Sequence, residues 1–138
     1  MKVSFSDLRE QHDGVFRENC PTRTVLDHVM SKWGVLVLFA LTDGTIRWGD
    51  LRRRIDGISE KMLSSTLRTL EADGLVSRRS YPEVPPRVEY ALTDLGGELM
   101  EKLGPLMEWV AAHADDIVAA PDARRAESRV GREADQTT

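Results

Sequence analysis

The chain has 138 residues, of which 41% are apolar and 30% charged, so we expect one folded domain with a small appendage. This composition excludes a disordered chain, and the longest apolar run, Trp33 to Leu41, is far too short to cross a bilayer. The first residues form no apolar signal segment and Cys20 is the only cysteine, so we expect a cytoplasmic protein without an internal disulfide.

The net charge of −4 conceals a basic centre. Residues 44 to 90 carry nine basic and seven acidic groups, whereas residues 91 to 120 carry one lysine and six acids. This distribution permits phosphate binding by the centre of the chain. A surface of mixed charges is the more ordinary explanation.

Helices are predicted in the first part of the chain. Residues 1–19 mix apolar and charged positions around Gly14 and predict a weak helix or an arm. Pro21 then opens an amphipathic helix that ends near Ser31, because apolar residues recur there at three-and-four spacing. The apolar run from Trp33 to Leu41 predicts a helix that is buried on most sides and forms the core.

Two more helices are predicted in the basic centre, after a short extended segment at residues 45–47. The first helix has Trp48, Leu51 and Ile55 on one face and arginines on the other. Ser59 is a good N-cap for the second helix, whose buried stripe consists of Leu63, Leu67 and Leu70. The opposite face of the second helix is small, polar and basic, with Lys61, Ser65 and Arg68 at its centre and Ser64 and Thr69 beside them.

A hairpin and a long helix follow. The strand candidates, residues 75–81 and 87–92, are separated by a loop whose three prolines should make its tip stand away from the sheet. Thr93 caps the last helix, which Pro105 can bend, and residues 121–138 lack apolar periodicity and predict a disordered tail.

The sequence contains none of the common catalytic or nucleotide-binding motifs. The three histidines, at positions 12, 28 and 113, lie far apart and form no ligand cluster, and metal binding by Cys20 with His28 would supply only two ligands, too few for a closed site. We therefore expect neither an enzyme nor a bound metal or cofactor.

The predicted order of elements is that of a winged helix-turn-helix domain, mainly α with a small β-hairpin (α+β). In such a domain the second helix of the pair enters the major groove of DNA. A small-sided outer face lets a helix approach base edges, while Arg and Lys bind phosphates and guanine. The alternative is an ordinary surface helix with solvated charges.

Several segments closely resemble the HxlR-type family of bacterial transcriptional regulators. They are Cys20-Pro21, Lys32-Trp33, Arg47-Trp48-Gly49-Asp50-Leu51, Gly57-Ile58-Ser59-Glu60-Lys61-Met62-Leu63, Leu70-Glu71-Ala72-Asp73-Gly74-Leu75-Val76 and Tyr81-Pro82-Glu83-Val84-Pro85-Pro86-Arg87-Val88-Glu89-Tyr90. The resemblance covers about residues 20 to 110, with Trp48 where a phenylalanine is usual. It places an HxlR-type domain with its C-terminal dimerisation helix at residues 20–113, between the arm and the tail.

The resemblance implies a homodimeric repressor or activator that pairs through its first and last helices and binds an inverted repeat. Lys61 lies in a block that resembles the family's, and helix geometry adds Ser64, Ser65, Arg68 and Thr69 as groove contacts. Arg87 resembles the family's wing arginine, although a hairpin salt bridge with Glu83 or Glu89 is the alternative. Four more arginines serve phosphates or merely solubility: Arg52, Arg53, Arg78 and Arg79.

The last helix carries more apolar surface than one side of a small domain can cover, which favours a dimer interface. The candidate interface residues are Leu95, Leu99, Leu103, Leu106, Met107 and Val110. The alternative is that the N-terminal arm covers this surface within one chain.

Cys20 has two interpretations. In some members that resemble this chain, a cysteine just before the first helix senses electrophiles or oxidants, and the positive helix end would favour a thiolate. A small buried packing group is the alternative.

We therefore expect a sequence-specific regulator whose partners are double-stranded DNA, a second copy and a small-molecule or electrophile effector. The competing hypothesis is a winged-helix protein-interaction module that binds no DNA.

Overall fold

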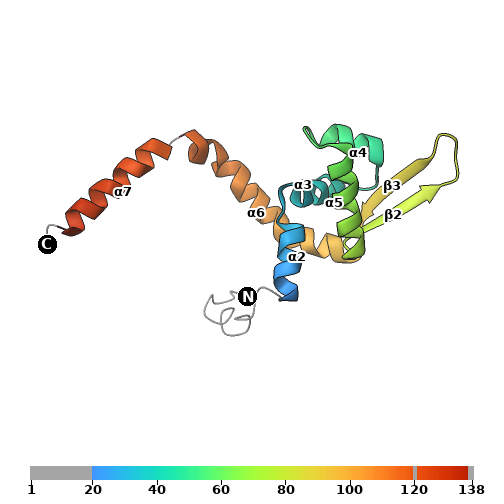
Figure 1. Cartoon of the computed structure of the whole chain (residues 1–138), viewed down its shortest axis with the longest axis horizontal. Helices are drawn as coiled ribbons and strands as arrows, with labels where there is room; N and C mark the ends of the chain where they lie inside the picture. Colours follow the sequence, from blue (N-terminus) through green and yellow to red (C-terminus); the bar gives the residue numbers. More distant parts are fainter. Residues whose placement is uncertain (1–19, 120, 137–138) are drawn as a thin grey trace. The chain divides into compact units, whose positions relative to one another are not determined.

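The computed structural model describes residues 20–119 and 121–136 (Figure 1). The chain divides into two compact units, Met1–Met100 and Glu101–Thr138. The boundary between them falls inside helix α6 (Asp94–Ala119). The arm expected at residues 1–19 lies outside the described residues.

The helices and strands of the first unit follow one another in the predicted order. They are α2 (Pro21–Val29), α3 (Lys32–Ala40), a 3₁₀ turn (Leu41–Asp43), β1 (Ile46–Arg47), α4 (Trp48–Arg54), α5 (Glu60–Ala72), β2 (Val76–Tyr81) and β3 (Arg87–Leu92). Predicted and observed bounds differ by one or two residues at the ends of α2, α3 and β2.

The core lies where α3, α4 and α5 meet. Val37 and Leu38 of α3, Leu51 of α4 and Leu63 of α5 are all 0% exposed. Burial of these apolar side chains stabilises the unit, since apolar surface removed from water is the main favourable term in folding. The predictions of a buried central helix and of a leucine stripe on α5 are confirmed.

A three-stranded antiparallel sheet completes the first unit. Its strand order is β1-β3-β2, and the short strand β1 pairs through Ile46 with Tyr90 of β3. β2 and β3 form the predicted hairpin, with Val76 opposite Leu92 at one end and Tyr81 opposite Arg87 at the other. Figure 1 shows this hairpin extending away from the helices, with its connecting loop at the far end. A mainly helical winged helix-turn-helix fold is therefore confirmed.

The C-terminal part of the chain is more helical than expected. The Thr93 hydroxyl accepts a hydrogen bond from the Gly96 N–H at 3.0 Å and so caps α6, as predicted. α6 includes Pro105 and continues to Ala119, and the expected disordered tail contains helix α7 (Pro121–Gln136). Alanine, arginine and glutamate are good helix formers, and a proline at the first position helps a helix to start. The absence of an apolar stripe predicts disorder for this segment, but a helix of such residues forms without a stripe.

No single helix in the described part of the chain has the length and apolar composition of a membrane span. Among the described helices, only α2 taken together with α3 and the 3₁₀ turn meets those criteria, as a pair bent by 67°. A mostly buried core helix passes the same test, and α3 is such a helix.

Candidate nucleic-acid interface

Helix α5 is held by a cap at its start and by leucines along its inner side. The Ser59 hydroxyl accepts a hydrogen bond from the Met62 N–H at 3.0 Å, which satisfies a backbone donor that has no partner within the helix. Leu63, Leu67 and Leu70 are buried. The opposite side of α5 is therefore fixed toward solvent.

The outer face of α5, which we define as Lys61, Ser64, Ser65, Arg68 and Thr69, contains all five groove contacts predicted from the sequence. Lys61, Ser65 and Arg68 are exposed, and Ser64 and Thr69 are partly exposed. Within the described chain no ion pair involves Lys61 or Arg68. The helix thus presents two uncompensated cations between small hydroxyl side chains, which suits close approach to a polyanion.

The three consecutive arginines of α4 differ from those cations, because each one faces an acid. The Arg52 and Glu60 side chains lie 3.2 Å apart, Arg53 pairs with Asp50, and Arg54 pairs with Asp43. These exposed pairs contribute little to stability, but they partly neutralise the arginines. Arg52 and Arg53 are therefore weaker candidates for phosphate contact than Lys61 and Arg68.

The wing, formed by β2, β3 and their loop, carries further arginines. Arg78 and Arg79 are exposed, and the Arg79 guanidinium lies 4.9 Å from the centre of the Tyr81 ring. All residues of the loop from Pro82 to Pro86 are exposed, with Val84 completely so. The predicted projecting tip is therefore present.

Arg87, at the base of the wing, makes contacts inside the hairpin. Its side chain lies 3.3 Å from the Glu83 carboxylate and 3.6 Å from that of Glu89, and its guanidinium lies 3.8 Å from the centre of the Tyr81 ring. The alternative noted from the sequence, a hairpin salt bridge, is thus present with both acids. Any contact between Arg87 and DNA would have to compete with these partners.

A hollow of about 480 Å³ lies between the start of α4 and the tip of the wing. Arg47, Arg53 and Arg87 line it, together with Trp48 and apolar residues of the wing loop. Arg47 was not among the residues predicted from the sequence, and it is exposed and forms no ion pair with any described residue. Its place directly before α4 was the available signal, because backbone N–H groups at a helix N-terminus favour nearby anions such as phosphate.

Cys20 directly precedes α2 and is partly exposed. Groups in the first turn of α2 hold the pKa of Cys20 below its ordinary value. The Thr22 side chain contributes most, followed by the Thr22 N–H, while the N–H and positive charge of Arg23 add smaller effects. Hydrogen bonds and positive charge favour the thiolate, so this thiol is more ionised at neutral pH than a free cysteine.

The dimer candidates on α6 differ in how much surface they leave open. Leu95, Leu106 and Val110 are 53%, 44% and 44% exposed, and Leu99 and Met107 are partly exposed. Leu103 is only 6% exposed, so it is already covered within the chain. Exposed apolar side chains also occur on α2 and at its C-cap, namely Val25, Leu26 and Met30.

No group of three or more His, Cys, Asp or Glu side chains in residues 20–119 and 121–136 is arranged to hold a metal ion.

Comparison with known proteins identifies the family. The model of the HxlR-like helix-turn-helix family matches residues 28–117, which include α3 to α5 and the whole wing. The chain belongs to the HxlR family. Because HxlR proteins are helix-turn-helix transcriptional regulators, the chain is a transcriptional regulator and not an enzyme.

Individual HxlR relatives agree with this assignment. The HTH-type transcriptional regulator YtfH of Escherichia coli K12 is 51% identical over 125 residues, covering 91% of this chain and 98% of YtfH. The solved structure of YtfH from Salmonella typhimurium has a TM-score of 0.73 and 51% identity, covering 76% of this chain and 94% of that one. The redox regulator HypR in its oxidised form has a TM-score of 0.60 and 38% identity, covering 67% of this chain and 96% of HypR.

Proposed function

We propose that this HxlR-family regulator binds duplex DNA as a homodimer, with one α5 helix in the major groove of each half of an inverted repeat. The observation that carries the proposal is the outer face of α5, where Lys61 and Arg68 are exposed without an ion pair in the described chain. Bidentate contact of Arg or Lys with guanine is the commonest specific contact in the major groove. Ser64, Ser65 and Thr69 add short hydroxyl side chains that can reach base edges or phosphates.

The wing and α4 would supply contacts of a different kind. Exposed arginines such as Arg47 and Arg78 suit phosphates, which position a protein on the duplex without reading its sequence. Arg52, Arg53, Arg79 and Arg87 have partners within the chain, so we expect them to contribute less.

The exposed apolar residues of α2 and α6 support pairing of two copies. A homodimer would cover this surface and would place two α5 helices about 34 Å apart, one turn of the duplex. An inverted repeat in the DNA would then mirror the twofold symmetry of the protein.

Cys20 would make DNA binding sensitive to oxidants or electrophiles. Its lowered pKa supports this role, since the thiolate is the reactive form, and HypR is described as a redox regulator. Oxidation of two Cys20 thiols to a disulfide would release two protons and pass two electrons to the oxidant. Addition of the thiolate to an electrophilic carbon–carbon double bond would instead form one carbon–sulfur bond and break the π bond, and the neighbouring carbon would take up a proton.

Selection of binding sites from a random duplex library at near-physiological salt tests this proposal. We expect an inverted repeat to emerge. The affinity of the protein for this repeat should fall steeply with added salt, because its Lys and Arg side chains release counterions from the DNA phosphates on binding. Absence of binding to any duplex at low salt would instead favour the protein-interaction hypothesis.

The role of the thiol is tested by repeating the selection after treatment with a mild thiol oxidant. We expect the inverted repeat to be lost on oxidation in the native protein and retained in the Cys20→Ser variant. Recovery of the same repeat from oxidised and reduced native protein would indicate that Cys20 is a packing residue and not a sensor.

A further inference from the structure

The C-terminal end of α5 is a tightly organised turn formed by Asp73, Gly74 and Leu75, which we call the end turn. The Leu75 N–H donates to the Leu70 carbonyl at 3.0 Å and the Gly74 N–H donates to the Glu71 carbonyl at 3.0 Å. Gly74 has a φ of +77°, a conformation that glycine adopts without strain. The end turn therefore has a defined shape onto which other elements can be fixed.

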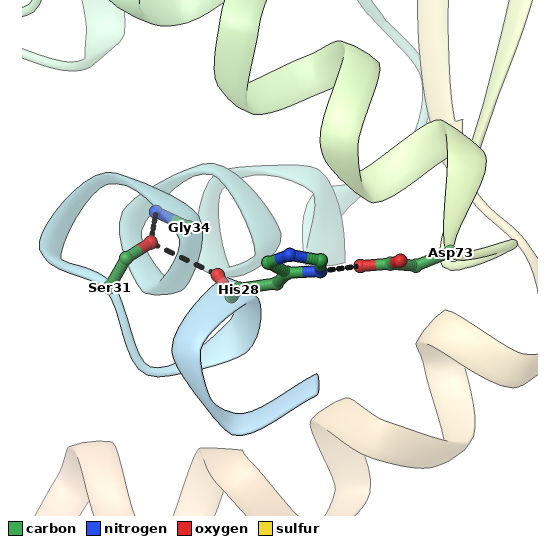
Figure 2. A network of polar contacts seen from close by, with 4 residues as sticks. All are labelled: His28, Ser31, Gly34 and Asp73. Atoms are coloured by element: carbon green, nitrogen blue, oxygen red, sulfur yellow. Dashed lines mark hydrogen bonds and ion pairs between the residues drawn. The ribbon is translucent and has the colours of Figure 1, made fainter. Parts of the chain in front are cut away.

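Helix α2 reaches the end turn through one side chain. His28 Nδ1 lies 2.7 Å from Asp73 Oδ2, and the two residues are 45 positions apart in the sequence (Figure 2). Both side chains are partly buried, at 33% and 21% exposure, which shields the contact from competing water. This contact joins α2 directly to the helix that carries Lys61 and Arg68.

The backbone at His28 is itself held in place. Figure 2 shows the Ser31 hydroxyl donating to the His28 carbonyl at 3.0 Å and accepting from the Gly34 N–H at 3.1 Å. A side chain at Gly34 would come within 2.3 Å of that carbonyl oxygen, so the junction of α2 and α3 is closely packed. Movement of α2 would therefore carry His28 with it.

The start of α6 reaches the same turn. The Thr93 hydroxyl donates to the Gly74 carbonyl at 2.6 Å, and the Thr93 N–H donates to the Leu75 carbonyl at 3.1 Å. A Cβ at Gly96 would lie 2.1 Å from the Leu75 carbonyl oxygen, so α6 touches the end turn with its backbone. α2 and α6, whose exposed apolar residues are the candidates for pairing, both meet α5 here.

From these contacts we infer that the end turn sets the position of the DNA-reading face of α5, and that His28 is a positioning residue for DNA recognition. The inference rests on the proposed function. Lys61 lies about 18 Å along the helix from Asp73, so a tilt of about 10° at the end turn moves Lys61 by about 3 Å. Such a displacement exceeds the tolerance of a hydrogen bond to a base edge. The separation of two α5 helices in a dimer therefore depends on this turn.

The experiment compares four single variants and the His28→Ala/Asp73→Ala double variant on the selected operator and on operators whose spacer between half-sites is one or two base pairs longer or shorter. His28→Ala and Asp73→Ala each remove the contact, and His28→Asn restores an N–H at the position of Nδ1. Glu71→Ala is the matched control, because it removes the same charge from the same end of α5. The Glu71 side chain makes no hydrogen bond or ion pair within residues 20–119.

Charge alone and the lost contact predict opposite results for Asp73. Removal of an acid reduces repulsion from phosphate, so charge alone makes both acid variants bind DNA more tightly. We expect Asp73→Ala and His28→Ala instead to bind the operator about tenfold more weakly and to lose most of their preference for the native spacer. The double variant should be no worse than either single variant, and His28→Asn should recover spacer preference.

If His28→Ala and Asp73→Ala keep the preference for the native spacer, the inference is overturned. A fall in their melting temperatures without a change in spacer preference would show that the contact contributes to stability alone. Arg68→Ala is assayed alongside to separate this failure from failure of the proposed function. If Arg68→Ala weakens binding while the end-turn variants keep spacer preference, only the inference fails. If Arg68→Ala also leaves binding unchanged, the assignment of α5 fails, and the inference fails with it.

Discussion

The pKa of Cys20 is lowered most by one neighbouring side chain, that of Thr22. We predict that Thr22→Val raises the pKa of Cys20, because the hydroxyl that favours the thiolate is lost. The rate of alkylation by iodoacetamide should therefore fall at pH 7, and its pH profile should move to higher pH. Thr24→Val is the matched control, since Thr24 is also an exposed threonine of α2. An equal shift in both variants would contradict the role of Thr22.

Single residues of the interface were predictable from the sequence to different degrees. Lys61 and Arg68 could be found because the leucine stripe of α5 determines which side faces outward. The acids that face Arg52 and Arg54 could not, since Asp43 is 11 positions from Arg54 and becomes its neighbour only on folding. For the same reason, the contact between His28 and Asp73 could not be predicted from the sequence. Local periodicity carries no information about contacts between elements.

The start of α6 depends on the absence of a side chain at one position. We predict that Gly96→Ala destabilises the protein by about 1–3 kcal/mol, because the added methyl meets the Leu75 backbone. Gly97→Ala is the control, as a Cβ added there would meet no other atom within 4 Å. It should stabilise the helix by about 0.5–1 kcal/mol. Urea denaturation measures both changes, and equal effects would contradict the close approach.

The start of α5 depends on the side chain of its cap residue, Ser59. Ser59→Ala removes the acceptor for the Met62 N–H and should lower the free energy of unfolding by about 1 kcal/mol. Ser80→Ala, at an exposed position of β2, serves as the control in the same denaturation experiment. A comparable loss in the control would show that the cap adds nothing specific.

Elements whose signals are local were predictable, and the others were less so. Ser59, the leucine stripe and the proline loop identify α5 and the hairpin because each acts within a few residues. α7 was missed because we required an apolar stripe, whereas its alanine, arginine and glutamate residues favour a helix without one. Pairing of β1 with β3 requires contact across more than forty positions, so the sequence indicated only that residues 45–47 were extended.

In the proposed homodimer, the exposed apolar residues of α6 pair with those of a second copy. Val110→Glu places a charge among exposed apolar residues and should dissociate the dimer, with a loss of operator affinity. Sedimentation equilibrium measures the assembly. Val118→Glu is the control, because Val118 is 77% exposed and lies about 80° around the helix from Val110. A dimer that persists in Val110→Glu would contradict pairing through this stripe.

The proposed function requires the outer face of α5 to read the base sequence of DNA. The most direct measurement is the affinity of Arg68→Ala for the selected operator and for an unrelated duplex, beside Lys102→Ala, which removes an exposed cation of α6. We predict that Arg68→Ala loses about tenfold or more in operator affinity, while its affinity for the unrelated duplex changes much less. Lys102→Ala should bind both duplexes as the native protein does. Unchanged operator affinity in Arg68→Ala, or equal losses of affinity for both duplexes, would contradict sequence reading by the outer face of α5.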